Sequence, residues 1–250
     1  MVCVTRVHEK PVLTDPVLIE GLPGIGFVAN IAALHLIQEL KAKLFAELRS
    51  SSFQDFATTA QNGDIRVPIN EFYYHKGKNG ERDFIILYGN TQALTTVGQY
   101  ELCGRILDIA EELGCRFIIT LGGLKTDRKV DVPKLYCAAS DSKPLSEALN
   151  LGAGILRGQI FGVAGLLVGL GKLRDIEGIC LLAETLGLYP DATAAREILK
   201  AIGRILHLEV DLSRLDVAAK TTRSTLESFG LIPSTIEKRT KEEARYRGVI

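Results

Sequence analysis

Apolar positions are distributed along the chain in two different patterns. Short continuous apolar runs at residues 17–20, 83–88 and 117–121 are typical of buried strands. Two longer segments, residues 27 to about 44 and residues 95–113, repeat their apolar residues every three or four positions, as a helix with one buried face does. The inward residues predicted for these helices are Ile31, Leu34, Ile37 and Leu40 in the first, and Val97, Tyr100, Ile106, Ile109 and Leu113 in the second.

A β-hairpin is predicted between the two helices. Its first strand shows alternation that shifts by one position partway along, which indicates a β-bulge. The alternating residues are Ile65, Val67 and Ile69 before the shift, and Phe72 and Tyr74 after it. Gly77-Lys78-Asn79-Gly80 then supplies an Asn-Gly turn into the strand at 83–88, so antiparallel pairing is expected.

The second half of the chain continues the alternation of strands and helices. Beyond Gly158 the pattern predicts a glycine-rich loop and an apolar strand, followed by a helix over residues 179–186. Pro190-Asp191 opens another helix, which runs to about Leu206. A last helix begins at Asp211 or Ser213, with predicted inward residues Leu215, Ala219, Thr222, Leu226 and Phe229. The whole pattern indicates a three-layer α/β fold with a mostly parallel sheet and an antiparallel hairpin.

The domain organisation follows from length and from a change in composition near the end. With 250 residues and a hydrophobic content of 46%, the chain can bury one sizeable core. Pro233 breaks the preceding helix pattern, and charged residues then dominate. We therefore expect a single α/β domain over residues 1–230 and a charged C-terminal tail over residues 231–250.

The segment VLIEGLPGIGFVAN, residues 17–30, leads a strand through a glycine-rich turn directly into a helix. Gly21, Gly24 and Gly26 can adopt positive φ or allow another backbone to approach closely, so a structural turn is one interpretation. A dinucleotide-binding turn is the other, because Gly24-x-Gly26-x-x-Ala29 matches the phosphate-binding fingerprint. Glu47 lies about where a ribose-binding acid is expected, but residues 20–23 make the turn longer than that fingerprint.

Composition and charge exclude several classes of protein. Lysine and arginine together equal aspartate and glutamate at 30 each, and a net charge of zero argues against a nucleic-acid-binding surface. The five cysteines stand singly and are expected to be reduced thiols, mostly in the core. The sequence shows no signal peptide and no uninterrupted membrane span, so we expect a cytoplasmic protein without nucleic-acid or membrane partners.

Candidate catalytic residues are few, and each has a structural interpretation. His35 lies on or beside the apolar face of the first helix, where a buried structural histidine is expected. The other candidates are His8, His75 and His207 near segment ends, Asn90, Thr91, Gln92 and Gln99 after a strand, and the charged loops at 125–131 and at Lys172, Arg174 and Asp175. No catalytic residue, cofactor or metal ligand is predicted. Gly122 and Gly123, at the end of a strand, are expected to be structural.

Three further segments accompany the glycine turn in one order. They are YGNTQALTTVGQYELCGRILDIAEELGCRFIITLGGL at 88–124, GQIFGVAGLLVGLG at 158–171 and GICLLAETLGLYPDATAAREILKAI at 178–202. Over about residues 12–229 the chain closely resembles the proteasome assembly chaperone family of the second type, its archaeal branch most nearly. The resemblance implies a non-enzymatic homo-oligomer that helps proteasome α-subunits assemble or docks on the α-ring. It also implies a fold related to that of the nucleoside phosphorylases, without their activity.

The C-terminus departs from part of that family. Some relatives end in a hydrophobic residue, a tyrosine and one final residue, which resembles the tail of proteasome activators. Here Tyr246 lies four residues from the end and Val249 precedes Ile250, so the strict signal is absent. We expect contact with α-subunits through the folded body or through an adaptor, with these three tail residues as the alternative contact. The alternative function is a small-molecule or nucleotide-binding enzyme that uses the turn from Gly21 to Gly26.

Overall fold

The computed structural model describes residues 3–59, 62–78, 81–127 and 132–228, with side chains as far as Thr221. The chain divides into two units, residues 1–211 and residues 212–250. The last helix lies in the second of these units, and the predicted division into a domain over residues 1–230 and a tail over residues 231–250 stays a prediction. The predicted tail, including Tyr246, Val249 and Ile250, lies outside the described residues.

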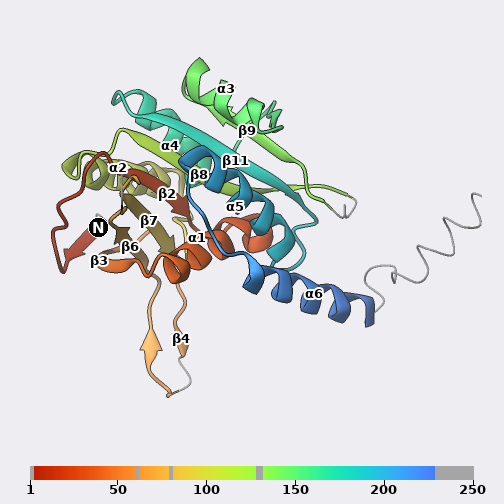
Figure 1. Cartoon of the computed structure of the whole chain (residues 1–250). Coiled ribbons are helices and arrows are strands. Elements are labelled where there is room, and N and C mark those ends of the chain that lie inside the picture. The colour runs from red at the N-terminus through yellow and green to blue at the C-terminus, as the bar shows by residue number, and fades with distance from the viewer. Residues whose placement is uncertain (1–2, 60–61, 79–80, 128–131, 229–250) are drawn as a thin grey trace, which may run out of the picture. The chain divides into compact units, whose positions relative to one another are not determined.

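Among the described residues, a nine-stranded mixed sheet forms the centre of the first unit (Figure 1). Its strands in chain order are β1 (Val4–Val7), β2 (Val17–Gly21), β3 (Lys43–Arg49), β6 (Asn70–His75), β7 (Phe84–Gly89), β8 (Phe117–Lys125), β9 (Leu135–Ala139), β10 (Gly154–Ile155) and β11 (Glu177–Thr185). Their order across the sheet is β1-β3-β6-β7-β2-β8-β11-β9-β10. Two short strands, β4 (Thr58–Thr59) and β5 (Ile65–Arg66), pair separately as a hairpin.

The four central strands β7, β2, β8 and β11 are parallel to one another, which matches their continuous apolar runs. Antiparallel pairs flank this centre, β6 with β7 on one side and β9 with β11 on the other. The β6–β7 pair is the predicted hairpin, although its Asn79-Gly80 turn lies outside the described residues. The α/β fold class is thus confirmed, whereas the relation to nucleoside phosphorylases stays a prediction.

Helices cover both faces of the sheet and complete three layers. They are α1 (Val28–Glu39), α2 (Thr96–Glu112), α3 (Ser142–Asn150), α4 (Val163–Lys172) and α5 (Ala192–Leu206), with α6 (Ser213–Ser228) in the second unit. α1 packs on β2, β7, β8 and α5, whereas α2 and α4 pack together and α4 lies on β8 and β11. Leu18 joins a core cluster with Leu102 of α2, while Gly21, three positions further along β2, faces α1. No helix in the described part of the chain is long and apolar enough to span a bilayer.

The parallel strands all end at one edge of the sheet, which we call the carboxyl edge. The last residues of the four strands are Gly21, Gly89, Lys125 and Thr185. In open α/β sheets this edge is where loops gather and where ligands usually bind. Every candidate in the glycine turn and in the Asn90 to Gln99 set therefore lies near it.

Residues 158–186 differ most from the sequence prediction. Val163–Lys172 forms helix α4 where a strand was expected, and Glu177–Thr185 forms strand β11 where a helix was expected. β11 lies between β8 and β9 and is buried on both faces, so its sequence has no polar alternation by which a strand is recognised. The leucines and alanine in this segment favour a helix locally, and pairing within the sheet overrides that preference.

The inward faces of α1 and α2 match the prediction in part, because Ile37, Ile106 and Ile109 are buried as expected. Leu34, Val97 and Tyr100 are exposed. The residues that α1 buries are Val28, Ala29, Ala32, Ala33, His35, Leu36 and Ile37. Alanines let a helix lie close to a sheet. The prediction relied on the large apolar side chains of α1, and it therefore misplaced the buried face of this helix.

Several strand ends also differ from the prediction. α1 ends at Glu39 and β3 follows, so the segment near residues 41–44 is not helical. β8 continues through Gly122 and Gly123 instead of ending before them. The first strand of the hairpin begins at Asn70, and Ile65 belongs to the separate strand β5. These errors fall at element ends and at the edge of the sheet, where apolar periodicity is weakest.

Candidate functional site

The glycine turn after β2 occupies the middle of the carboxyl edge. From Gly24, which is extended, the chain passes through one 3-10 turn, Ile25–Phe27, into α1. Gly26 and Phe27 both adopt positive φ, 64° and 51°. Glycine takes this conformation without strain, but for a phenylalanine it costs about 1–2 kcal/mol. The turn therefore holds Phe27 in an unfavourable backbone conformation at the first position before a helix.

Gly21 and Gly24 differ in their need to be glycine. A Cβ on Gly21 would lie 2.2 Å from the Cβ of Ala33 and 2.7 Å from the carbonyl oxygen of Ala29. No atom lies within 4 Å of the corresponding position on Gly24. Close packing of α1 on β2 requires glycine at position 21, whereas the structure gives no such reason at position 24.

The glycine pair in β8 shows the same contrast. A Cβ on Gly123 would lie 2.3 Å from the backbone carbonyl oxygen of Ile25, so β8 and the turn touch through bare backbone. A Cβ on Gly122 would meet only the mobile end of the Leu182 side chain, at 2.6 Å. Gly123 is therefore the position at which the turn and the sheet depend on glycine.

Thr185 and Asp191 connect the turn to the end of β11. Thr185 donates a hydrogen bond from Oγ1 to Asp191 Oδ2 at 2.8 Å, and Asp191 Oδ1 accepts from the N–H of Ala194 at 3.0 Å. The N–H of Asp191 donates to the carbonyl oxygen of Gly26 at 2.8 Å. Asp191 is thus the N-cap of α5, at the helix start that the sequence predicted, and it also ties down the turn. Thr185 was missed because its segment was assigned to a helix.

The predicted polar set is engaged in loop structure. Gln92 donates from Nε2 to the carbonyl oxygen of Pro23 at 2.6 Å and accepts from the N–H of Val163 at 3.1 Å, which joins the turn to the start of α4. Asn30, which the sequence did not single out, donates from Nδ2 to the carbonyl oxygen of Gly89 at 2.7 Å. The remaining members make similar local bonds: Asn90 with Ile69, Thr91 with Gln92, and Gln99 with Ala93. These groups brace the carboxyl edge.

Above this braced backbone the edge exposes apolar side chains. Ile25 and Phe27 are 47% and 48% exposed, and Leu188 is 77% exposed. Gly187, beside Leu188, approaches the Ile25 side chain so closely that a Cβ would lie 2.7 Å from its Cγ2. We call Ile25, Phe27 and Leu188 the turn surface. Its chemistry suits contact with another protein, because apolar side chains on a rigid base lose little conformational entropy on binding.

Glu20 is buried directly beneath the turn. Its Oε1 accepts a hydrogen bond from the N–H of Leu22 at 2.8 Å, whereas Oε2 has no partner within the described residues. Burial raises the pKa of Glu20 to about 7, against the opposing effect of hydrogen bonds from the backbone at Leu22 and Leu121. Burial also raises the pKa of the nearby Cys103 and Cys180 thiols to about 12, so these thiols are neutral. The sequence interpretation treated Glu20 only as a turn residue.

The structure does not place Glu47 where a dinucleotide-binding fold would have its acidic residue. Glu47 lies in β3, which is antiparallel to β6 and is separated from β2 by both β6 and β7. In a dinucleotide-binding fold the acid lies on the parallel strand beside the glycine turn. Here Glu47 pairs instead with Arg49 at 2.9 Å and with His8 at 3.4 Å.

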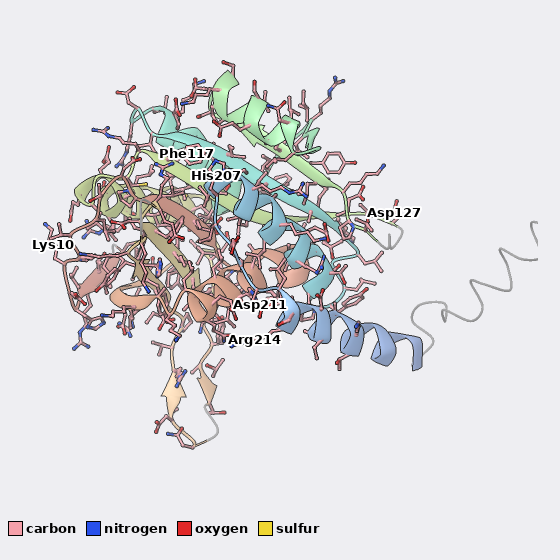
Figure 2. The ribbon with its side chains drawn as sticks, in the orientation of Figure 1. Lys10, Phe117, Asp127, His207, Asp211 and Arg214 are labelled. Carbon is pink, nitrogen blue, oxygen red and sulfur yellow. The ribbon has the colours of Figure 1, made fainter. Side chains whose placement is uncertain are left out.

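The remaining candidates are scattered over the first unit. His35 is buried and its Nε2 lies 2.6 Å from the carbonyl oxygen of Asp211, while His75 stacks on Phe84 and His207 ends α5. Figure 2 shows Asp127 and His207 in well-separated parts of the ribbon. Lys172 pairs with Asp141 at 3.4 Å, Arg174 pairs with Asp108 at 2.8 Å, and Asp175 has positive φ. Residues 128–131 of the charged loop lie outside the described residues.

Cysteines and metal ligands add no further site in the described part of the chain. Cys3, Cys103, Cys115, Cys137 and Cys180 are all free and buried. No three His, Cys, Asp or Glu side chains among the described residues gather as metal ligands. The turn surface is therefore the feature of the carboxyl edge best suited to bind another molecule.

Comparison with known proteins identifies the family. A sequence model of the PAC2 family matches residues 18–229, which is most of the chain. The chain belongs to the PAC2 family. The resemblance inferred from the four sequence segments, from the glycine turn to the LLAET segment, is thereby confirmed.

Two solved structures superpose closely on the chain. The crystal structure of PbaB from Pyrococcus furiosus, described as an archaeal proteasome activator, matches with a TM-score of 0.87 at 40% identity, covering 92% of this chain and 99% of PbaB. PbaA of the same organism, described as an archaeal homolog of proteasome-assembly chaperone, matches with a TM-score of 0.77 at 25% identity over 99% of both chains. A protein of Methanocaldococcus jannaschii is 35% identical over 227 residues, 90% of this chain and 86% of that protein.

Proposed function

We propose that this chain is a non-enzymatic, homo-oligomeric PAC2 protein of the cytoplasm that binds proteasome α-subunits through its folded body. The observation that carries the proposal is the turn surface. In an open α/β enzyme the carboxyl edge would present polar groups to a ligand. Here Gln92, Asn30, Thr185 and Asp191 are occupied in bracing the backbone, and apolar side chains face outward.

The strained backbone at Phe27 supports a role in binding. Strain of this kind persists where the surrounding structure enforces it, and it concentrates at functional sites. The hydrogen bond between Gly26 and Asp191 and the bare contact of Gly123 with Ile25 supply that enforcement. Relatives described as a proteasome activator and as a homolog of a proteasome-assembly chaperone support a proteasome partner, and the family resemblance implies that the subunits bound are α-subunits. Whether free subunits or assembled rings are bound is decided by a pulldown with both forms.

Replacing Phe27 by asparagine is expected to separate binding from stability. Asparagine tolerates positive φ, so the backbone strain falls and the free energy of unfolding stays equal or rises by up to about 1 kcal/mol. The apolar ring is lost at the same time, and a central aromatic contact typically contributes 2 kcal/mol or more to binding. Affinity for α-subunits, measured by biolayer interferometry, is therefore expected to fall about thirtyfold.

Val12→Asn serves as the matched control, because Val12 is also exposed but lies in the loop before β2. It is expected to leave α-subunit affinity unchanged. Equal affinities for Phe27→Asn and the native chain would contradict a contact through the turn surface. If deleting residues 237–250 abolished binding while the oligomer persisted, the tail would be the contact instead.

A nucleotide-binding enzyme remains the second candidate, because the space above Gly24 is open. Thermal unfolding with millimolar nucleotides tests it directly. A ligand present at a hundred times its dissociation constant raises the free energy of unfolding by about 2.7 kcal/mol. We expect no shift in the melting temperature, and a shift with any nucleotide would favour the enzyme.

A further inference from the structure

A shallow groove runs between α2 and α4. Its volume is about 520 Å³, and none of the eleven residues that line it is charged. Leu94 and Tyr100 form one side, Phe161 and Leu166 the other, and Gly165 and Gly169 of α4 contribute no side chains. An uncharged concave surface is unusual on a chain in which 24% of the residues are charged.

Phe161 stands at the rim of this groove and is 83% exposed. The backbone is held directly after it. Gly162 follows it with a φ of 80°, a conformation that favours glycine, and the next N–H, that of Val163, donates to Gln92 Oε1 at 3.1 Å. The backbone next to the aromatic ring is therefore fixed, so burying the ring in a partner requires little ordering of the chain.

Gly169 leaves the far end of the groove open. No atom lies within 4 Å of the position that a Cβ would take on this residue. Val97, on the first turn of α2, is exposed beside Tyr100. We call Leu94, Val97, Tyr100, Phe161 and Gly169 the α2–α4 surface. One molecule thus carries both a projecting aromatic ring and an apolar groove beside it.

We propose that the α2–α4 surface pairs with the same surface of a second copy of this chain, with Phe161 of each copy entering the groove of the other. A two-fold interface must be complementary to itself, and a projecting ring beside a groove meets that requirement. The absence of charge in the groove lining means that two identical copies approach without like-charge repulsion. The inference rests on the homo-oligomer in the proposed function and adds the surface and the symmetry through which it forms.

The exposed apolar side chains supply much of the area that such an interface needs. Aromatic side chains bury about 150–250 Å² each when fully covered. Because Phe161 is 83% and Tyr100 is 54% exposed, the four rings of two copies would bury roughly 500 Å² together. Leu94 and Val97 of both copies and the threonines around them extend this toward the about 1,200 Å² at which stable interfaces begin.

Light scattering coupled to gel filtration tests the inference on the full chain. The native protein is expected to have at least twice the monomer mass of 27.3 kDa, and Phe161→Asp at least a twofold lower mass than the native protein. Val97→Asp is expected to act in the same direction. Val12→Asp, which places the same charge on an exposed valine outside the α2–α4 surface, is expected to keep the native mass. Circular dichroism should show all three variants folded.

Cross-linking supplies an independent measurement. The five native thiols are buried, so a cysteine introduced as Gly169→Cys is the site at which a short bis-maleimide reacts in the folded protein. We expect a cross-linked dimer from Gly169→Cys and none from Val12→Cys.

The inference would be overturned if Phe161→Asp and Val97→Asp kept the native mass and Gly169→Cys gave no cross-linked dimer. The proposed function would then stay in place. A monomeric native protein would overturn the homo-oligomer as well. If Phe161→Asp kept the native mass but lost α-subunit binding, the groove would be a partner site rather than a self-association site.

Discussion

Gly21→Ala is expected to destabilise the fold by about 3 kcal/mol, because its Cβ would lie 2.2 Å from Ala33 and 2.7 Å from the backbone of Ala29. Both neighbours belong to α1, so the helix as a whole would have to move away from β2. For a chain of this size, such a loss lowers the melting temperature by roughly 10 °C. Differential scanning calorimetry and chemical denaturation would measure it.

Gly24→Ala is the matched control, three residues further along the same turn. Its Cβ meets no atom within 4 Å and its φ is −154°, so the free energy of unfolding is expected to change by less than about 0.5 kcal/mol. Equal destabilisation by the two variants would show that the packing of α1 on β2 is not what requires glycine here. A stable Gly24→Ala variant that lost measurable nucleotide affinity would favour the dinucleotide-binding interpretation.

Glu20→Gln is expected to change how stability depends on pH. In the unfolded chain Glu20 ionises near pH 4.5, whereas burial raises its pKa to about 7 in the folded chain. Between these values the folded state retains a proton that the unfolded state has lost, so the free energy of unfolding falls as the pH rises through this window. The fall amounts to about 3 kcal/mol by the time the pH exceeds 7. Glutamine cannot ionise, so the variant lacks this loss.

The measurement compares urea unfolding of Glu20→Gln and the native chain at pH 4 and at pH 8. The variant is expected to gain about 3 kcal/mol relative to the native chain between the two conditions. Glu177→Gln, at an exposed glutamate, is expected to show no such gain. A difference between Glu20→Gln and the native chain that is the same at both pH values would show that the pKa of Glu20 is not raised in the folded chain.

The local sequence pattern was sufficient to predict three of the four strands in the parallel core, β2, β7 and β8. β2, β7 and β8 appear as short apolar runs because strands buried on both faces need apolar residues at successive positions. The N-cap at Asp191 was also readable, because a carboxylate that accepts from an N–H three residues later is a purely local arrangement. Gly114, just after α2, has positive φ, a conformation that favours glycine where a helix ends.

Local pattern failed where partners distant in the chain decide the conformation. The LLAET segment favours a helix by composition, and it is a strand because β8 and β9 lie on either side of it. The face that α1 buries was misplaced because small residues, rather than large ones, allow a helix to approach Gly21. Which glycines are required was equally invisible, since Gly21 and Gly24 differ only in what lies beside them.

The sequence by itself determined the family, the α/β class and the place of the glycine turn, because each depends on residues close together in the chain. Only the tertiary structure showed that Asn30, Gln92, Thr185 and Asp191 brace the carboxyl edge, that Phe27 is strained, and that Glu20 is buried with one oxygen unpaired within the described residues. It also brought Tyr100 and Phe161 to one groove. Several of these features arise from contacts between residues far apart in the chain, such as the 59 positions between Asn30 and Gly89 and the 69 between Pro23 and Gln92. Hydrophobic periodicity records which face of an element is buried, but not which neighbour covers it.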